Sequence, residues 1–313
     1  MPHSQTKIYI LLGLVVLTWG LLWPINKVGL YYIAPLWYIS LRLIIATICM
    51  FLLAKVLGKL TLPKWRDWPM IFIVGFFQTG LFLGFLTIGL TQVGAGRAAI
   101  LVYSTPIWVT PIAYFFFDES LSRFKLIGVI LGVAGILLLF SPWGLDWSHK
   151  GIIIGNILLL LAALSWAFAM IFTRYMPWHS SVLQITPWQL LFATIPICFL
   201  ALFLEPPPHI ILNTSLIVSL LYASIFGTAF AYWGIVTVSK ELPVITTSLS
   251  LLGVPIISVI ASAIFLHEPI TLTIFFAMVL ILAGLAVASL NNKPLTKIIS
   301  KNRSLDKRNA SGE

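Results

Sequence analysis

The chain has 313 residues, of which 60% are hydrophobic and only 9% are charged. A soluble domain carries about 25% charged residues, and its surface tolerates few large apolar patches. Lipid solvates apolar faces directly, so the composition indicates a membrane protein and disfavours soluble enzymes, nucleic-acid-binding proteins and soluble structural proteins. The formal net charge is +10. Its basic residues flank apolar runs, as charges that orient a membrane helix bundle do, so we predict no nucleic-acid partner.

Ten apolar runs have the length of about 20 residues that a membrane-spanning helix needs. In chain order they cover residues 8–26, 36–54, 68–88, 96–117, 124–140, 152–172, 182–204, 216–238, 244–266 and 272–290. The predicted fold is therefore an all-α integral membrane protein with ten transmembrane helices and short connections. A basic tail follows at residues 293–313.

The basic residues gather on one side of this predicted bundle. If the N-terminus is inside, the inner connections contain Lys55, Lys59, Arg123 and Arg174 among others, whereas the outer ones contain Lys27, Arg97 and Lys150. Cytoplasmic connections are enriched in Lys and Arg. We expect both termini in the cytoplasm, with the chain in a bacterial inner membrane and the tail on the cytoplasmic side.

The two halves of the chain resemble each other, at residues 1–143 and 151–292. A shift of 149 residues places Pro106 on Pro255, Glu119 on Glu268 and Gly135 on Gly284. Between the runs 8–26 and 152–172, and between 36–54 and 182–204, the shift is 147. Each half has five predicted helices, an odd number, so the second copy would cross the membrane in the opposite sense. Inverted repeats of this kind are typical of secondary transporters.

Several motifs of these repeats are similar to those of the EamA family in the drug/metabolite transporter superfamily. They comprise Thr18-Trp19-Gly20, Gly94-Ala95-Gly96-Arg97, Phe117-Asp118-Glu119, Ser165-Trp166-Ala167 and Leu266-His267-Glu268. A proline lies thirteen residues before both Glu119 and Glu268. The resemblance covers essentially the whole chain. It implies a ten-helix bundle around a central cavity, lined mainly by the first, third, fourth, sixth, eighth and ninth helices. It also implies export of amino acids, related metabolites or drug-like compounds.

Polar and aromatic residues within the apolar runs are candidates for the lining of such a cavity. Trp19, Trp23 and Asn26 are spaced i, i+4, i+7 and share one helix face, and Trp166 lies at the position equivalent to Trp19. Aromatic walls with few hydrogen-bonding groups suit small, partly apolar ligands. The other candidates are Gln78, Tyr103, Ser104, Tyr232, Trp233 and Ser248. Packing residues or interfacial aromatic belts are the alternative interpretation for each.

Three basic residues, Lys27, Arg42 and Arg97, lie toward the predicted outer side and together could hold an anionic group such as a carboxylate. Arg42 lies inside an apolar run, where it must face protein or water or extend its charge toward the head groups. For Lys27 we favour a role in anchoring a helix end. Arg97 is our main candidate for attracting substrate, because it opens a run that should line the cavity.

The acidic residues and histidines all fall at predicted helix ends, in connections or in the tail. No carboxylate or imidazole is predicted near the membrane midplane, which favours a facilitator or exchanger over a proton-coupled carrier. Glu119 and Glu268 each precede a helix, where we expect them to bind unpaired amides at the start of that helix. If an acidic residue titrates during transport, Glu119 and Glu268 are the candidates. Pro106 and Pro255 are predicted to kink two helices at matched positions, as gating elements.

Catalytic motifs such as a phosphate-binding loop or a zinc-binding H-E-x-x-H are not found, so we expect a protein that is not an enzyme, without cofactor or metal. Cys49 and Cys198 lie in apolar runs, as small core residues do. The leading hypothesis is a secondary transporter that exports amino acids or related metabolites by alternating access, as a monomer or homodimer. The alternatives are an exchanger or importer of another small solute, nucleotide-sugar-like or drug-like, and a membrane protein that transports nothing.

Overall fold

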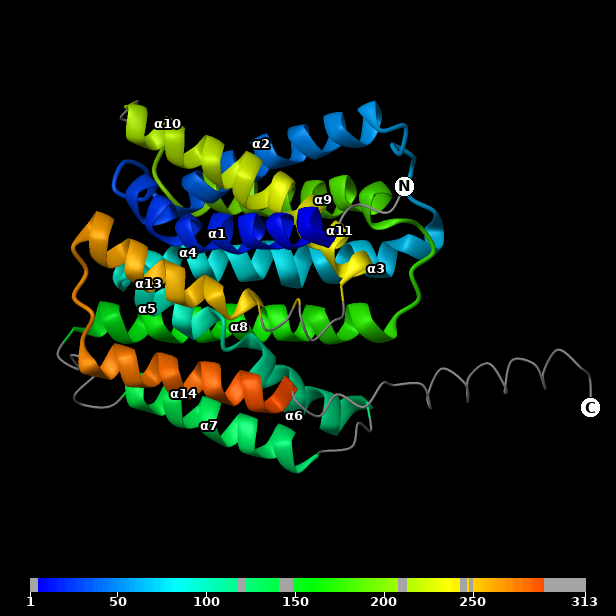
Figure 1. The fold of residues 1–313 in the computed structure, drawn as a ribbon. Coiled ribbons are helices and arrows are strands. Elements are labelled where there is room, and N and C mark those ends of the chain that lie inside the picture. The colour runs from blue at the N-terminus through cyan, green and yellow to red at the C-terminus, as the bar shows by residue number, and fades with distance from the viewer. Residues whose placement is uncertain are drawn as a thin grey trace, which may run out of the picture.

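The computed structural model describes residues 5–117, 122–140, 149–207, 213–242, 247 and 250–289, and these residues form helices and turns without any strand. Figure 1 shows the helices running back and forth side by side as a bundle. The helices of the first half are α1 (Gln5–Gly29), α2 (Pro35–Val56), η1 (Trp65–Asp67), α3 (Trp68–Phe72), η2 (Ile73–Leu81), α4 (Phe82–Gln92), α5 (Ala95–Val102), α6 (Thr105–Phe117) and α7 (Arg123–Leu139). Those of the second half are α8 (Lys150–Tyr175), α9 (Val182–Leu204), α10 (Thr214–Leu221), η3 (Tyr222–Phe230), α11 (Ala231–Glu241), α13 (Gly253–Leu266) and α14 (Leu272–Ser289).

Within the described residues, eight helices, counting consecutive helical segments as one, are long and apolar enough to cross a membrane. The other two runs that the sequence predicts as spans are shorter here: α7 has 17 residues and α13 has 14. The predicted start of the ninth run, at residue 244, and the tail at 293–313 lie outside the described residues. The multi-pass helical character that composition predicts is thus present in the structure.

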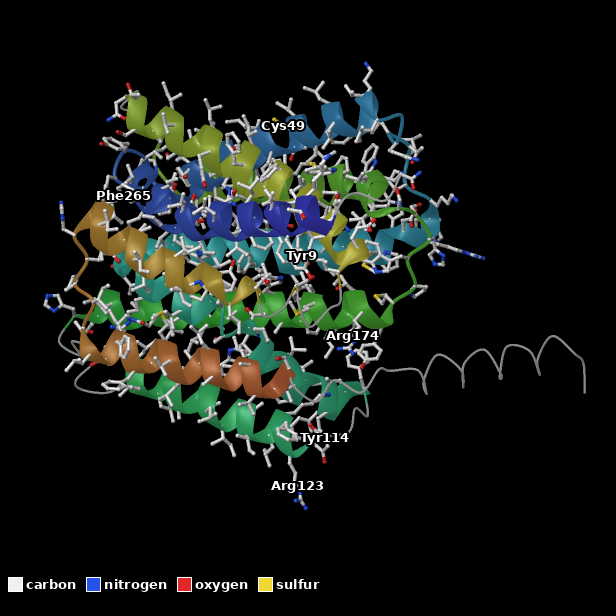
Figure 2. All side chains as sticks on the ribbon, in the orientation of Figure 1. Tyr9, Cys49, Tyr114, Arg123, Arg174 and Phe265 are labelled. Carbon is white, nitrogen blue, oxygen red and sulfur yellow. The ribbon has the colours of Figure 1, made fainter. Side chains whose placement is uncertain are left out.

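Large apolar side chains cover the outside of the bundle. Phe115, Phe203 and Leu272 are 75–81% exposed, and Figure 2 shows Tyr9 and Phe265 among the side chains that project from it. Water would make such a surface costly, whereas lipid tails solvate it. The interior is built from small residues: alanines such as Ala98 are fully buried in the main core, which lets the helices approach closely.

Helix pairs related by the predicted repeat make matching contacts. The first helix of the first half, α1, packs against α13 of the second half. The equivalent helix of the second half, α8, packs against α5 and α6, of which α6 corresponds to α13. Likewise α4 packs on α8, and α1 packs on η3 and α11. Between α2 and α9, the hydroxyls of Thr47 and Thr194 are 3.0 Å apart and hydrogen-bonded, and these two threonines are related by the offset of 147. Residues at equivalent positions of the two halves are thus in direct contact here.

Two π-helical segments, η2 and η3, occupy matched positions in the two halves. Both have nine residues, and their first residues, Ile73 and Tyr222, differ by 149. A π-helix shifts the backbone hydrogen bonds to i→i+5 and occurs often at functional sites. Ser165 Oγ donates to Phe77 O of η2 at 2.8 Å, and Trp19 Nε1 donates to Gly227 O of η3 at 3.1 Å.

The predicted proline kinks are helix breaks in the structure. The helical run 95–117 is interrupted at Tyr103 and Ser104, so Pro106 lies in the first turn of α6. Similarly, Pro255 lies in the first turn of α13, just after the turn at Leu252. A first-turn proline fits without loss of a helical hydrogen bond. The prediction that these prolines bend helix interiors is therefore wrong, although the two interruptions do fall at matched positions.

Glycines bring α7 and α14 together along one edge of the bundle, where Figure 1 shows the two helices side by side. A Cβ atom built at Gly284 would lie 2.6 Å from the carbonyl oxygen of Gly128, and one at Gly128 would lie 2.5 Å from that of Gly284. One at Gly135 would lie 2.9 Å from the carbonyl oxygen of Ala277. By the offset of 149, Gly135 and Ala277 are the counterparts of Gly284 and Gly128, so this contact also obeys the repeat.

We expect Gly284→Ala to destabilise the protein by about 1–3 kcal/mol, because the added methyl group meets backbone of α7 that cannot rotate away. The matched control is Gly13→Ala on α1, where nothing lies within 4 Å of the added atom and alanine favours the helix by up to about 1 kcal/mol. Thermal unfolding of the purified protein in detergent measures both. Equal midpoints for the two variants would contradict the close packing of α7 on α14.

Candidate functional site

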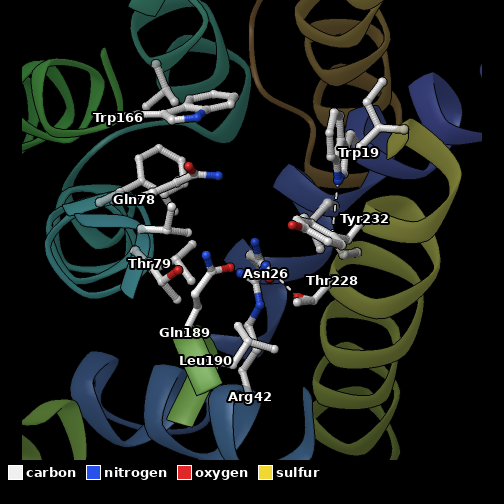
Figure 3. A pocket seen from close by; sticks show the side chains of 18 of the residues that line it. Trp19, Asn26, Arg42, Gln78, Thr79, Trp166, Gln189, Leu190, Thr228 and Tyr232 are labelled. Carbon is white, nitrogen blue, oxygen red and sulfur yellow. Dashed lines mark hydrogen bonds between the residues drawn. The ribbon is translucent and has the colours of Figure 1, made fainter. Parts of the chain in front are cut away.

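A cavity of about 370 Å³ lies between the two halves at the centre of the bundle. Figure 3 shows side chains from both halves directed into it. Seven of the residues predicted for a central cavity line it: Trp19, Trp23, Asn26, Gln78, Tyr103, Trp166 and Tyr232. The helix-face spacing of the three α1 residues thus identified a face that turns inward.

Three predicted cavity residues lie elsewhere, and two candidates fall outside the described residues. The Arg97 guanidinium donates to Asn156 Oδ1 at 2.9 Å and to the carbonyl of Leu139, so it joins α5 to the helices beside it. Ser104 Oγ is buried and donates to Leu101 O at 2.6 Å. Trp233 is 39% exposed and does not line the cavity, although its neighbour Tyr232 does. Ser248 and Glu119 lie outside the described residues.

The second and seventh predicted helices also line the cavity, a contribution that the resemblance did not lead us to expect. They provide Arg42 and Met50 from α2 and Thr186, Gln189 and Leu190 from α9. The repeat could have revealed them, because most lining residues form pairs at the two offsets. The pairs are Trp19 with Trp166, Trp23 with Met170, Arg42 with Gln189, Gln78 with Gly227, Thr79 with Thr228, Leu83 with Tyr232, Leu86 with Ile235 and Val102 with Leu251.

Among the described residues that line the cavity, Arg42 is the one with a charge, and it has little hydrogen bonding within the protein. Its side chain is 4% exposed. Its Nη2 donates to Thr228 Oγ1 at 3.4 Å, and its Nε has no partner. Gln189 is 1% exposed, and its Nε2 also has no partner. Figure 3 shows both side chains extending from α2 and α9 toward Asn26.

Aromatic rings form much of the remaining wall. The rings of Trp23 and Tyr103 lie 6.4 Å apart, and those of Tyr103 and Trp166 lie 6.1 Å apart, both edge to face. Phe82 lies 5.1 Å from Trp166. Such edge-to-face contacts hold the rings in fixed orientations. The cavity therefore combines a rigid aromatic surface with a small group of hydrogen-bond donors.

Lys27 anchors a helix end, as its sequence position suggested. Its Nζ donates to the carbonyl oxygens of Leu90, Thr91 and Val93 at 2.5, 3.2 and 2.8 Å, at the end of α4. A cation is favoured there because the last carbonyls of a helix lack intrahelical partners. The Lys27 ammonium group thus binds the end of α4, and Lys27 lies outside the lining of the cavity.

Glu268 binds helix amides, but those of a different helix from the one predicted. We expected the following helix, α14. Instead, its carboxylate accepts from the amides of Ala95 and Gly96 at 2.7 and 3.1 Å, at the start of α5. Glu205 binds the first amides of α2 in the same way, from Leu36 and Trp37. Docking of distant helices brings these partners together, which local sequence cannot indicate.

We expect Glu268→Ala to lower the unfolding free energy by about 0.5–2 kcal/mol, because the first amides of α5 lose their acceptors. Glu268→Gln keeps one carbonyl oxygen and should lose less. Thermal unfolding in detergent measures the order, with the exposed Glu241→Ala as the control. A pH profile of transport that is lost in Glu268→Gln, at unchanged stability, would instead assign the acid a role in proton coupling.

Comparison with known proteins identifies the family. The model of the EamA-like transporter family matches residues 6–141 and 153–290. The chain belongs to the EamA-like transporter family. It is thus a transporter of that family in a multi-pass helical membrane fold, as its motifs predicted, and the family indicates transport rather than catalysis.

Relatives in this family are named as transporters. A probable amino-acid metabolite efflux pump of Salmonella typhimurium is 30% identical over 285 residues, covering 88% of this chain and 92% of that protein. The uncharacterised transporter YoaV of Bacillus subtilis is 28% identical over 279 residues, covering 88% and 95%. A crystal structure at 19% identity superposes with a TM-score of 0.61 over 92% of this chain and 98% of that one, which supports the fold alone.

Proposed function

We propose that the chain exports amino acids or related small metabolites through the central cavity. The observation that supports this most directly is the cavity itself, whose volume of about 370 Å³ lies in the range of small-molecule sites. Two relatives, from Salmonella typhimurium and Escherichia coli, are named probable amino-acid metabolite efflux pumps. The substrate site comprises the aromatic residues Trp19, Trp23, Tyr103 and Trp166 with the hydrogen-bonding groups around them.

The fold proposed for this function is a bundle of ten transmembrane helices in two inverted repeats. The matched π segments η2 and η3, the paired Thr47 and Thr194, and the paired cavity residues support it. The family model also matches the chain twice, within residues 1–143 and 151–292. In such a fold one repeat can move against the other and open the cavity to either side in turn. The matched breaks before Pro106 and Pro255 provide places where the helices can bend.

The orientation proposed has both termini in the cytoplasm of a bacterium, with the chain in the inner membrane. On the side of the N-terminus, Lys55 and Arg174 lie in the last turns of α2 and α8, and Arg66 lies just before α3. Lys27 and Arg97 lie at the opposite side, in the last turn of α1 and the first turn of α5. The excess of basic residues on the first side supports its placement in the cytoplasm.

Transport by exchange or facilitated passage fits the cavity better than proton coupling. Among the described lining residues there is no carboxylate and no imidazole. Proton relays in transporters are commonly built from such groups. The gradient of the solute, or of a second solute moving the other way, would then drive export.

Counterflow tests the proposal. Purified protein in proteoliposomes, preloaded with an unlabelled amino acid or metabolite, should accumulate the same labelled solute transiently. Thr79→Phe should remove most of this signal, because Thr79 is buried in the cavity wall and the ring would fill the cavity. The matched control Thr61→Phe lies in an exposed connection and should transport normally. Lack of counterflow with any solute of a broad panel would contradict the proposal.

A further inference from the structure

We propose that Arg42 and Gln189 form an anion-binding end of the cavity, and that the substrate is a monoanionic organic acid with an apolar or aromatic body. This rests on the proposed transport through the cavity and narrows its substrate class. An acid of this kind carries a carboxylate but no ammonium group. It is thus an amino-acid-related metabolite rather than an amino acid in its zwitterionic form.

The first reason is the uncompensated charge of Arg42. The side chain is 4% exposed and lies on α2, within a membrane-spanning helix. Among the described residues that line the cavity, Arg42 meets neutral groups and no carboxylate. A buried cation without an anionic partner is costly in a medium of low dielectric. A carboxylate bound beside Arg42 would remove this cost.

The second reason is that each of the two residues has an unused hydrogen-bond donor. Arg42 Nε and Gln189 Nε2 are both buried and both lack a hydrogen-bond acceptor. Buried donors without partners are rare in proteins, and these two come from equivalent positions of the two halves, at the offset of 147. A guanidinium fork binds a carboxylate through two parallel hydrogen bonds, and the amide of Gln189 can donate to the same oxygens.

The third reason is that one half contributes a charge and the other does not. At equivalent positions, α2 presents a cation and α9 presents a neutral amide. The described lining therefore carries a single positive charge, which one carboxylate balances. An ammonium group on the ligand would add a second positive charge near Arg42, where repulsion is screened weakly. The aromatic rings of Trp19 and Trp166 remain for the apolar body.

Three probes with the same aromatic body distinguish the charge classes: phenylpyruvate, phenylalanine and phenethylamine. Binding to the purified full-length protein is followed by the fluorescence of its tryptophans, and counterflow is followed in proteoliposomes. We expect phenylpyruvate to bind at least about tenfold more tightly than phenylalanine, because both carry the carboxylate but only phenylalanine adds an ammonium charge that Arg42 repels. Phenethylamine, which has the ammonium group and no carboxylate, should not bind. A branched 2-oxo acid, 4-methyl-2-oxopentanoate, tests the same charge on an aliphatic body. Equal or tighter binding of phenylalanine, or no binding of either acid, would overturn the assignment.

Variants connect the selectivity to the two residues. Arg42→Gln should weaken phenylpyruvate binding by about tenfold or more, and Arg42→Lys, which keeps the charge but not the fork, should weaken it less. Gln189→Glu places a carboxylate beside Arg42 and should abolish binding of the acids while leaving the protein folded. Arg66→Gln removes an equal charge from an exposed connection and serves as the control. Thermal unfolding of each variant separates loss of binding from loss of fold.

The outcomes separate this inference from the broader proposal. If the acids bind in a manner that depends on Arg42 but no solute shows counterflow, the anion site stands and transport through it does not. If amino acids are exchanged equally well by the wild type and by Arg42→Gln, transport stands and the anion site is wrong. Unchanged phenylpyruvate binding in both Arg42→Gln and Gln189→Glu would also overturn it.

Discussion

A polar group inside a protein dissolved in lipid must find its partner within the protein, because hydrocarbon offers none. Three of the described helix ends meet this constraint with side chains that are distant in sequence. Lys27 binds the last carbonyls of α4, Glu205 the first amides of α2, and Glu268 those of α5. The same hydrogen bonds that complete these helix ends also dock helices of different parts of the chain, so local structure and tertiary packing depend on each other.

In the central cavity, two buried donors lack a partner within the protein. Arg97 and Lys27 are cations whose hydrogen bonds go to protein oxygens, whereas Arg42 and Gln189 each keep a buried donor unused. Buried unpaired donors lower stability, and functional sites are where such a cost is expected. The difference in partners, rather than the presence of a charge, separates a cation that holds helices together from one that is available to a ligand.

Residues at matched positions of the two halves gather at the cavity. Matched positions such as Thr79 and Thr228 meet in the lining, and Thr47 and Thr194 bond to each other between α2 and α9. In the inverted-repeat fold that we propose, equivalent residues would meet close to an approximate twofold axis. At one such pair of positions the two halves differ in charge, with Arg42 in the first half and Gln189 in the second. The single positive charge of the described lining comes from Arg42, because the equivalent Gln189 is neutral.

The sequence by itself determined the membrane class, the positions of most helices, the repeat and its offsets, because the length and composition of apolar runs do not depend on how the helices dock. It also identified seven cavity residues, where a polar or aromatic stripe such as that of Trp19 and Trp23 marks one face. The tertiary structure decided which arginine faces the cavity, and which helix Glu268 caps. In lipid a helix can be apolar on every side, so sequence pattern leaves its rotation open. Close packing between distant helices fixes that rotation, and with it the choice of Arg42 over Arg97.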